Sequence, residues 1–204
     1  YTGYDLRPYL PVIYSGYDLP GDGNQRLNIE KLKVLSIMYG DFLKRMSDWL
    51  EGYGMGYHHQ AAYSTHLETQ EAMGHISVPE VESLNYMDCM GGYIAATSAA
   101  RLHGHQKVSC EMGATFRNPY NGRLRNLLTQ INLALVSGVN QMKLHTSTFR
   151  YGENGLWPGT NIHYSSLPDF NDTQPFWSEM DLICGAIDRG QFVVRRGKAK
   201  RDVL

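Results

Sequence analysis

The sequence predicts an α/β fold built from parallel βα repeats. Four short apolar stretches are typical of strands, and they cover residues 54–61, 75–80, 106–114 and 139–147. Stretches typical of helices separate them, and strands that alternate with helices form parallel βαβ units. The pattern fits an open doubly wound sheet or part of a (β/α)8 barrel. No GxGxxG or GxxxxGK[ST] follows any of the strands, which argues against a nucleotide-binding fold.

The composition and charge of the chain argue against some classes of binding partner. The chain has 204 residues, enough for one domain with a sizeable core, and 42% of them are apolar. Its charged fraction is 19% and its formal net charge is -1, so neither nucleic acid nor an anionic membrane is expected as a partner. No apolar run reaches membrane-spanning length. A composition rich in tyrosine and glycine, here 14 and 21 residues, is common in proteins that handle sugars and equally common in secreted proteins generally.

The first segment, residues 1–28, is rich in Gly, Pro and Tyr and is expected to connect elements through turns and short extended pieces. From Ile29 a helical pattern begins, and Phe42, Met46 and Trp49 share one face of it. We assign residues 29–180 to the βα units of a catalytic domain. Residues 181–204 are expected to hold a helix and the start of a following domain.

Three further helices lie between or beside the strands. Ser64 is a candidate N-cap for a helix over 64–74, and Gly74 is its stop signal. Small residues dominate the helix predicted over 91–104. The helix over 121–138 has an apolar face, formed by Leu124, Leu127, Leu128, Ile131 and Leu135.

Polar side chains stand where each predicted strand ends: His58, His59 and Gln60; Glu80 and Glu82; Glu111; His145. In a parallel barrel these positions converge on the carboxyl-terminal mouth, where active sites lie. Neighbouring residues of a strand point to opposite faces, so at most one of the two adjacent histidines can point inward. The strand ends therefore predict a polar pocket.

Paired carboxylates across a cleft are the catalytic groups of glycoside hydrolases. Glu80 or Glu82 is expected to face Glu111 from the adjacent strand. Glu80 and Glu82 are two residues apart, so both can point inward, where they would repel each other unless a cation lay between them. Calcium is one such cation because it prefers oxygen ligands. Glu80 or Glu82 is then a metal ligand.

Other residues of the predicted mouth suit sugar binding. Gln60 and His58 can bind hydroxyl groups, His145 can contact the substrate, and Trp157 in a long loop can stack on a sugar face. A serine or cysteine nucleophile is less well supported by the sequence than the paired carboxylates. The chain has no GxSxG motif, and strand alternation places Cys110 on the face opposite Glu111.

Several segments together resemble glycoside hydrolase family 106 and its fungal relatives, which are α-L-rhamnosidases. They are "GYDLRPYLPVI", "VPEVESLNY", "KVSCEMGA" and "GVNQMKLHTSTF" followed by "WPG". The resemblance implies a (β/α)8 catalytic domain, inversion by two glutamates and a calcium ion near the sugar. It falls on Glu80, Glu82, Glu111 and His145. Relatives commonly have Gly after that histidine, and this chain has Thr146.

The resemblance also implies that further acidic residues precede the first segment in relatives. We therefore expect an internal fragment of a secreted enzyme that holds about half a barrel and is inactive alone. The substrate expected is a terminal deoxy-sugar on a glycan or glycoside. One alternative is a non-catalytic carbohydrate-binding protein. The other is a sugar-acid lyase or isomerase, which needs a basic residue in the mouth, and Lys143 shares a face with His145 by the period of two.

Overall fold

Parallel strands connected by helices make up the second of two units in the chain, Val78–Leu204, which follows a first unit, Tyr1–Ser77. The computed structural model describes residues 3, 5–61, 67–86, 89–114, 122–147, 170–172 and 174–197. The second unit contains the following elements in chain order: β2 (Val78–Glu82), α4 (Ser83–Tyr86), α5 (Met90–Leu102), β3 (Ser109–Met112), α6 (Leu124–Val136), β4 (Gln141–Leu144), η3 (the 3₁₀-helix Trp177–Glu179) and α7 (Met180–Arg196).

The strands β2, β3 and β4 are neighbours in one sheet, and both pairings are parallel. Glu80 lies beside Ser109, and Glu82 lies beside Glu111. On the other side of β3, Glu111 lies beside Lys143. The predicted α/β class and its parallel βα repeats are therefore confirmed, while closure into a barrel stays a prediction.

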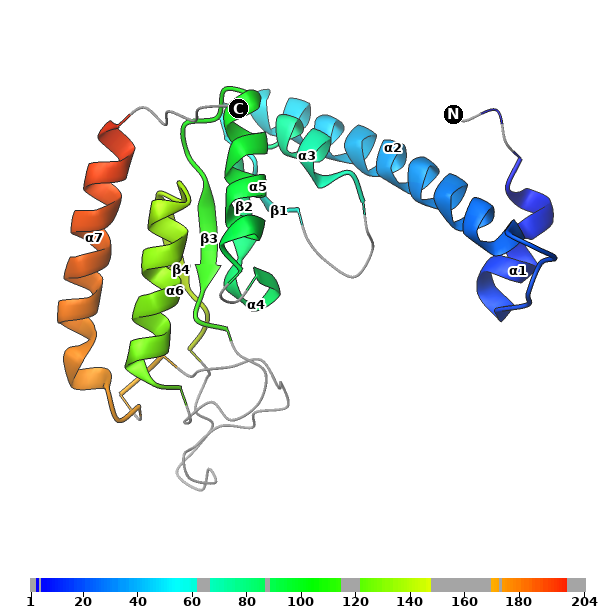
Figure 1. Ribbon diagram of the computed structural model, residues 1–204. Helices are drawn as coiled ribbons and strands as arrows, with labels where there is room; N and C mark the ends of the chain where they lie inside the picture. Colours follow the sequence, from blue (N-terminus) through cyan, green and yellow to red (C-terminus); the bar gives the residue numbers. More distant parts are fainter. Residues whose placement is uncertain are drawn as a thin grey trace, which may run out of the picture. The chain divides into compact units, whose positions relative to one another are not determined.

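Helices cover one face of this sheet. α5 contacts β2, α6 contacts β3, and Figure 1 shows α6 between α5 and α7. The strand residues that face them, Val81, Cys110 and Met112, are at most 3% exposed. From the helices come mainly small and aliphatic side chains: Ala96, Ala99, Ala100, Leu127, Ile131, Ala134, Ile183 and Ile187. The small residues of α5 allow its backbone to approach the sheet closely.

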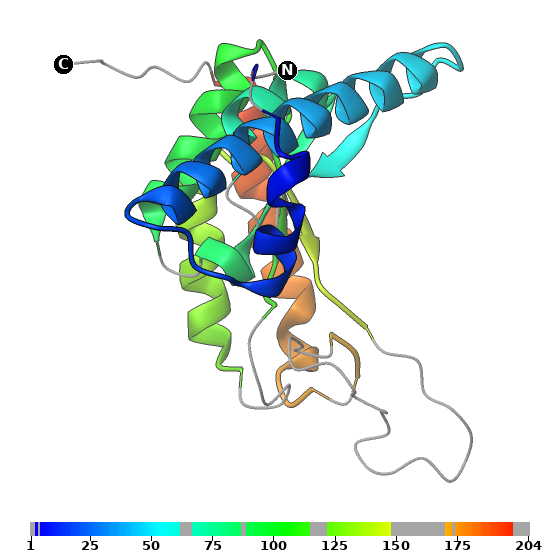
Figure 2. The same ribbon diagram turned by 90° about the vertical axis from the view of Figure 1, so that its right-hand side faces the viewer.

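The first unit is mainly helical. It comprises η1 (Arg7–Tyr9), α1 (Leu10–Ser15), α2 (Gly23–Glu51), β1 (His58–Gln60), α3 (Thr69–Ala72) and η2 (Met73–His75). Figure 2 shows α2 as one long helix with α1 near its N-terminal part. The expectation of turns and extended pieces was wrong for residues 7–15, which are helical. Pro8 and Pro11 stand in the first turns of η1 and α1, where a missing N–H costs nothing.

Predicted element boundaries differ as well. The strand expected over 75–80 begins at Val78 and continues to Glu82, so Glu80 and Glu82 lie within β2 rather than after it. The helix expected over 64–74 is shorter, since α3 begins at Thr69 and gives way to η2. Ser64 lies outside the described residues. Within the described part of the chain, no helix is both long and apolar enough to span a bilayer.

The turn after β3 depends on a glycine. Gly113 has a φ of 90°, and a Cβ built there would lie 2.7 Å from the ring of Phe170. Its N–H donates to Ser83 Oγ at 2.9 Å, which ties the turn to the end of β2. Both the backbone conformation and the contact require a residue without a side chain.

We predict that Gly113→Ala destabilises the protein by about 2 kcal/mol or more, because it adds a collision to the strain of a positive φ. Thermal unfolding of the complete polypeptide that contains these residues measures this. Gly104→Ala is the matched control, since Gly104 has a φ of 81° but no atom within 4 Å of an added Cβ. Equal shifts in the two variants would contradict the collision with Phe170.

Candidate active site

The face of the sheet opposite the helices is polar. Side chains alternate along a strand, so the register that buries Val81 and Cys110 places Glu80, Glu82, Ser109 and Glu111 together on the other face. Lys143 joins them from β4 as the register neighbour of Glu111. His145 follows two residues later, and its N–H bonds to Met112 O at 2.9 Å. We call this set of six residues the carboxylate face.

Glu80 is held from two sides. Its Oε2 accepts a hydrogen bond from Ser109 Oγ at 2.6 Å and lies 3.1 Å from Lys143 Nζ. The residue is only 7% exposed. Two donors on one oxygen, one of them charged, fix the orientation of this carboxylate and stabilise its negative charge.

Glu111 forms the more accessible part of the carboxylate face. Its Oε1 lies 3.2 Å from His145 Nε2, and the two side chains are 20% and 33% exposed. The other ring nitrogen, His145 Nδ1, is buried and has no hydrogen-bond partner within the described part of the chain. An imidazole against a carboxylate that solvent reaches can orient that carboxylate and exchange a proton with it.

Glu82 completes the set of carboxylates. It is 3% exposed and lies directly beside Glu111 across the β2–β3 pair. Neighbouring strands are about 4.8 Å apart, so the two backbones bring these side chains into the same region. The prediction that carboxylates from adjacent strands lie on one face is thus correct for Glu80, Glu82 and Glu111.

Cys110 lies on the opposite face, as the strand alternation predicted, and it is fully buried. Burial raises the pKa of its thiol well above the usual value, and the nearby charges of Glu80, Glu111 and Glu82 raise it further. A thiol that stays protonated near neutral pH is a poor nucleophile. Cys110 therefore belongs to the core.

In the first unit, β1 carries the three polar residues predicted at its end. His59 is bound on both ring nitrogens, with Nε2 2.8 Å from Tyr39 Oη and Nδ1 3.1 Å from Tyr57 Oη. Burial lowers the pKa of His59, and His58 adds to the effect. His59 is thus a structural residue, and His58 and Gln60, both half-buried, stay predictions as substrate contacts.

Two residues of the carboxylate face, Ser109 and Lys143, were not predicted as site residues of the hydrolase. Ser109 precedes Glu111 by two positions, and Lys143 precedes His145 by two, so the period of the strand was the signal for both. The predicted aromatic residue, Trp157, lies outside the described residues. Another aromatic residue, Trp177, is 40% exposed and lines a hollow of about 540 Å³ beside the carboxyl end of β4.

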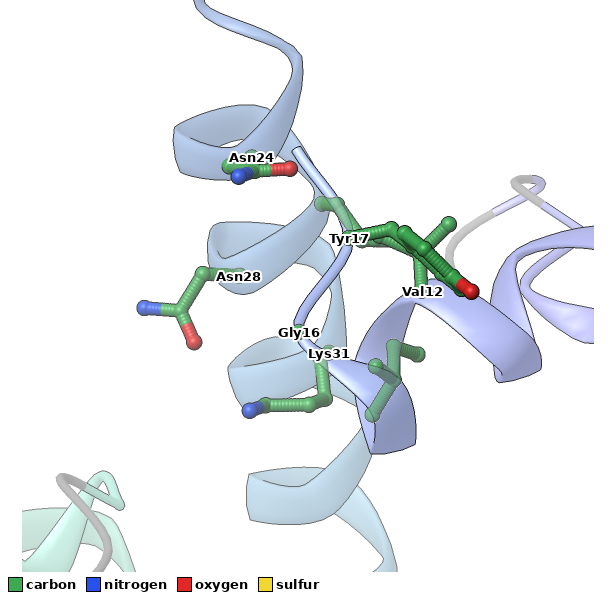
Figure 3. Close-up of a pocket in the computed structure, with 8 residues that line it drawn as sticks. Val12, Gly16, Tyr17, Asn24, Asn28 and Lys31 are labelled. Atoms are coloured by element: carbon green, nitrogen blue, oxygen red, sulfur yellow. The ribbon is translucent and has the colours of Figure 1, made fainter. Parts of the chain in front are cut away.

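A smaller pocket of about 160 Å³ lies between α1 and α2. Asn24 is already engaged there, since its amide donates to Asp18 Oδ1 at 2.8 Å and accepts from the Leu19 N–H at 3.0 Å. Figure 3 shows Asn28 and Lys31 pointing away from Tyr17. Because its polar groups do not converge, this pocket lacks the arrangement of a ligand site.

The carboxylates Glu80 and Glu82 are of the kind that calcium prefers. Among the residues that the structure describes, however, no group of three or more His, Cys, Asp or Glu side chains is placed to hold a metal ion. One oxygen of Glu80 already faces Lys143. A calcium ion bound here would need further ligands, so the metal stays a prediction.

The chain was compared with known proteins. A family model described as alpha-L-rhamnosidase matches residues 1–204. The search of curated proteins gave no match. Among solved structures, a rhamnosidase from Novosphingobium sp. PP1Y is similar with a TM-score of 0.68 and 21% sequence identity. The match covers 97% of this chain and 20% of that one, so the chain spans about a fifth of the length of that rhamnosidase.

The solved structure and the family model support different conclusions about this chain. At 21% identity the solved structure supports the fold, whereas the family model covers every residue of the chain. Both agree with the resemblance carried by the segments around Glu80, Glu111 and His145. The chain therefore belongs to the α-L-rhamnosidase family, glycoside hydrolase family 106.

Proposed function

We propose that the complete polypeptide containing these residues hydrolyses a terminal deoxy-sugar, an α-L-rhamnoside or a close analogue, from glycans or other glycosides. The observation that carries this proposal is the carboxylate face, where three glutamates from two adjacent parallel strands share one side of the sheet. Family membership supplies the reaction class. The chain would contribute one side of the active site and about half of the barrel, and would be inactive alone.

Hydrolysis of a glycoside needs one carboxylic acid that protonates the leaving oxygen and one carboxylate that activates water. Glu111 is proposed as one of them because it is the most exposed glutamate of the carboxylate face. Glu80 or Glu82 is proposed as its partner. Inversion of the anomeric centre requires room for a water molecule between the two carboxyl groups.

Further residues are proposed to position the sugar. His145 contacts Glu111 and would orient both that carboxylate and a substrate hydroxyl. Gln60 and His58 of β1 and Trp157 of the long loop complete the proposed contacts. A calcium ion near the sugar and a secreted location are also proposals that follow from the family resemblance. Neither nucleic acid nor a membrane is proposed as a partner.

The sugar-acid lyase or isomerase needs a free cation in the mouth to hold the substrate carboxylate. Lys143 does lie on the carboxylate face, but its ammonium is paired with Glu80. This pairing favours the hydrolase. A non-catalytic carbohydrate-binding protein on the same scaffold is the other candidate, and it differs from the hydrolase in releasing no sugar.

We predict that Glu111→Gln lowers the rate of rhamnose release from an aryl α-L-rhamnoside by about a hundredfold or more, the scale expected when a positioned acid or base is lost. Glu80→Gln or Glu82→Gln should cause a comparable loss. Glu51→Gln, at an exposed glutamate that ends α2, is the control and should retain wild-type activity.

The same assay with a chelator tests calcium. Loss of activity on chelation and its return with added Ca²⁺ are the expected results, and full activity in the chelator would remove the metal from the proposal. A wild-type protein that binds rhamnosides but releases no sugar would instead favour the non-catalytic alternative.

We predict that Cys110 resists alkylation by iodoacetamide in the folded protein near neutral pH, while Cys89 and Cys184, both exposed, react. The raised pKa keeps the Cys110 thiol protonated, so its reactivity would appear only at alkaline pH or on unfolding. Mass spectrometry of the digested protein measures all three sites. Rapid labelling of Cys110 in the native state would overturn its assignment to the core.

A further inference from the structure

Three carboxylates on one face of a sheet need a compensating charge. Glu80 and Glu82 are 7% and 3% exposed, and Glu111 lies beside Glu82. Like charges at this spacing repel, and buried carboxylates lose most of their hydration. A cation among them would lower this repulsion and help the three carboxylates to share the face.

The chain supplies such a cation from β4. Lys143 is the register neighbour of Glu111, yet its ammonium lies 3.1 Å from Glu80 Oε2, which belongs to β2. The side chain thus passes over β3, on the side where Ser109 points. Ser109 donates to the same oxygen of Glu80 at 2.6 Å. The hydroxyl and the ammonium together leave Glu80 Oε2 little freedom to turn.

We propose that Lys143 is a positioning residue, which holds Glu80 in place and compensates its charge so that the three glutamates can share the same face. This proposal rests on the proposed glycoside hydrolysis. The repulsion between the glutamates is then reduced by an ammonium group that belongs to the chain itself. It also means that the role of Lys143 is exerted through Glu80 and not through a carboxylate of the substrate.

The exposure of the two partners indicates what kind of effect to expect. The Lys143 side chain is 48% exposed, whereas the Glu80 side chain is 9% exposed. Ion pairs in which solvent screens one partner contribute little to stability. A charged hydrogen bond onto a buried carboxylate nevertheless fixes its orientation. Loss of Lys143 should therefore affect turnover more than unfolding.

The test uses the complete polypeptide and an aryl α-L-rhamnoside. Lys143→Met should lower kcat by about tenfold, the effect of losing one hydrogen bond to a charged group, with a smaller change in KM. Lys143→Arg should restore most of kcat because it keeps the charge and the donors. Lys107→Met, at an exposed lysine before β3, is the matched control and should leave kcat unchanged.

A second background separates positioning from a general effect of the substitution. In Glu80→Gln, the further change Lys143→Met should alter kcat by less than about twofold, because no carboxylate remains to be held. A wild-type kcat in Lys143→Met, or the same fold loss of kcat in both backgrounds, would overturn the proposal. Failure of Lys143→Arg to restore kcat would overturn it as well.

Unfolding temperatures test the Lys143–Glu80 pair without relying on the proposed function. They are measured for the wild type, Glu80→Gln, Lys143→Met and the double variant. If the wild type releases no sugar, the hydrolase proposal fails, and the pair is judged by unfolding alone. Shifts for Glu80→Gln and Lys143→Met that do not add in the double variant show that the two side chains are coupled. Additive shifts, or no shift at all in Lys143→Met, show that the two side chains are independent and sink the positioning role.

Discussion

The alternation of side chains along parallel strands is the constraint on which both the core and the carboxylate face depend. In β2 and β3, one set of residues packs under α5 and α6 and the other set faces away from them. A slip of one residue would bring Glu82 or Glu111 into the core and expose Val81 or Cys110. The free energy that buries the apolar set therefore also fixes which carboxylates lie together.

Side chains at both ends of the strands secure this register. At one end the buried Asn140 accepts from the Val108 N–H at 2.9 Å and donates to Gln106 O at 2.7 Å. At the other end Ser83 Oγ accepts from the Gly113 N–H. These bonds connect the segment before β3 to the residue before β4, and the turn after β3 to the residue after β2. Hydrogen bonds between side chains and the backbone therefore help packing to fix the positions of the strands.

The outer edge of β4 is covered by α7. Gln191 Oε1 accepts from the Met142 N–H at 2.8 Å, and Arg195 Nε donates to Asn140 O at 2.7 Å. These side chains satisfy one backbone N–H of β4 and the backbone carbonyl of the residue before it. Lys143 follows Met142 in β4, so α7 binds the strand directly beside the residue whose ammonium faces Glu80.

The amino-acid pattern alone was sufficient to predict the existence and type of the longer elements and the face on which most candidate residues lie. Apolar periodicity found α2, α6 and the strands, and the period of two correctly separated Cys110 from Glu111. Prediction from the sequence failed where one residue type is common in two kinds of local structure. Proline marks turns but also begins helices, which is why the helical residues 7–15 were missed. The end of β2 was missed because glutamates are rare inside strands.

Which polar groups contact one another became clear only from the folded chain. The pairing of Lys143 with Glu80, the hydrogen bond from Ser109, and the contact of His145 with Glu111 join residues that lie far apart in the sequence. A periodic pattern assigns a side chain to a face, but it gives neither the stagger between strands nor the reach of a long side chain across one of them. Those quantities arise when the helices pack on the opposite face and fix the register, and this is the physical reason why they could not be predicted from the sequence.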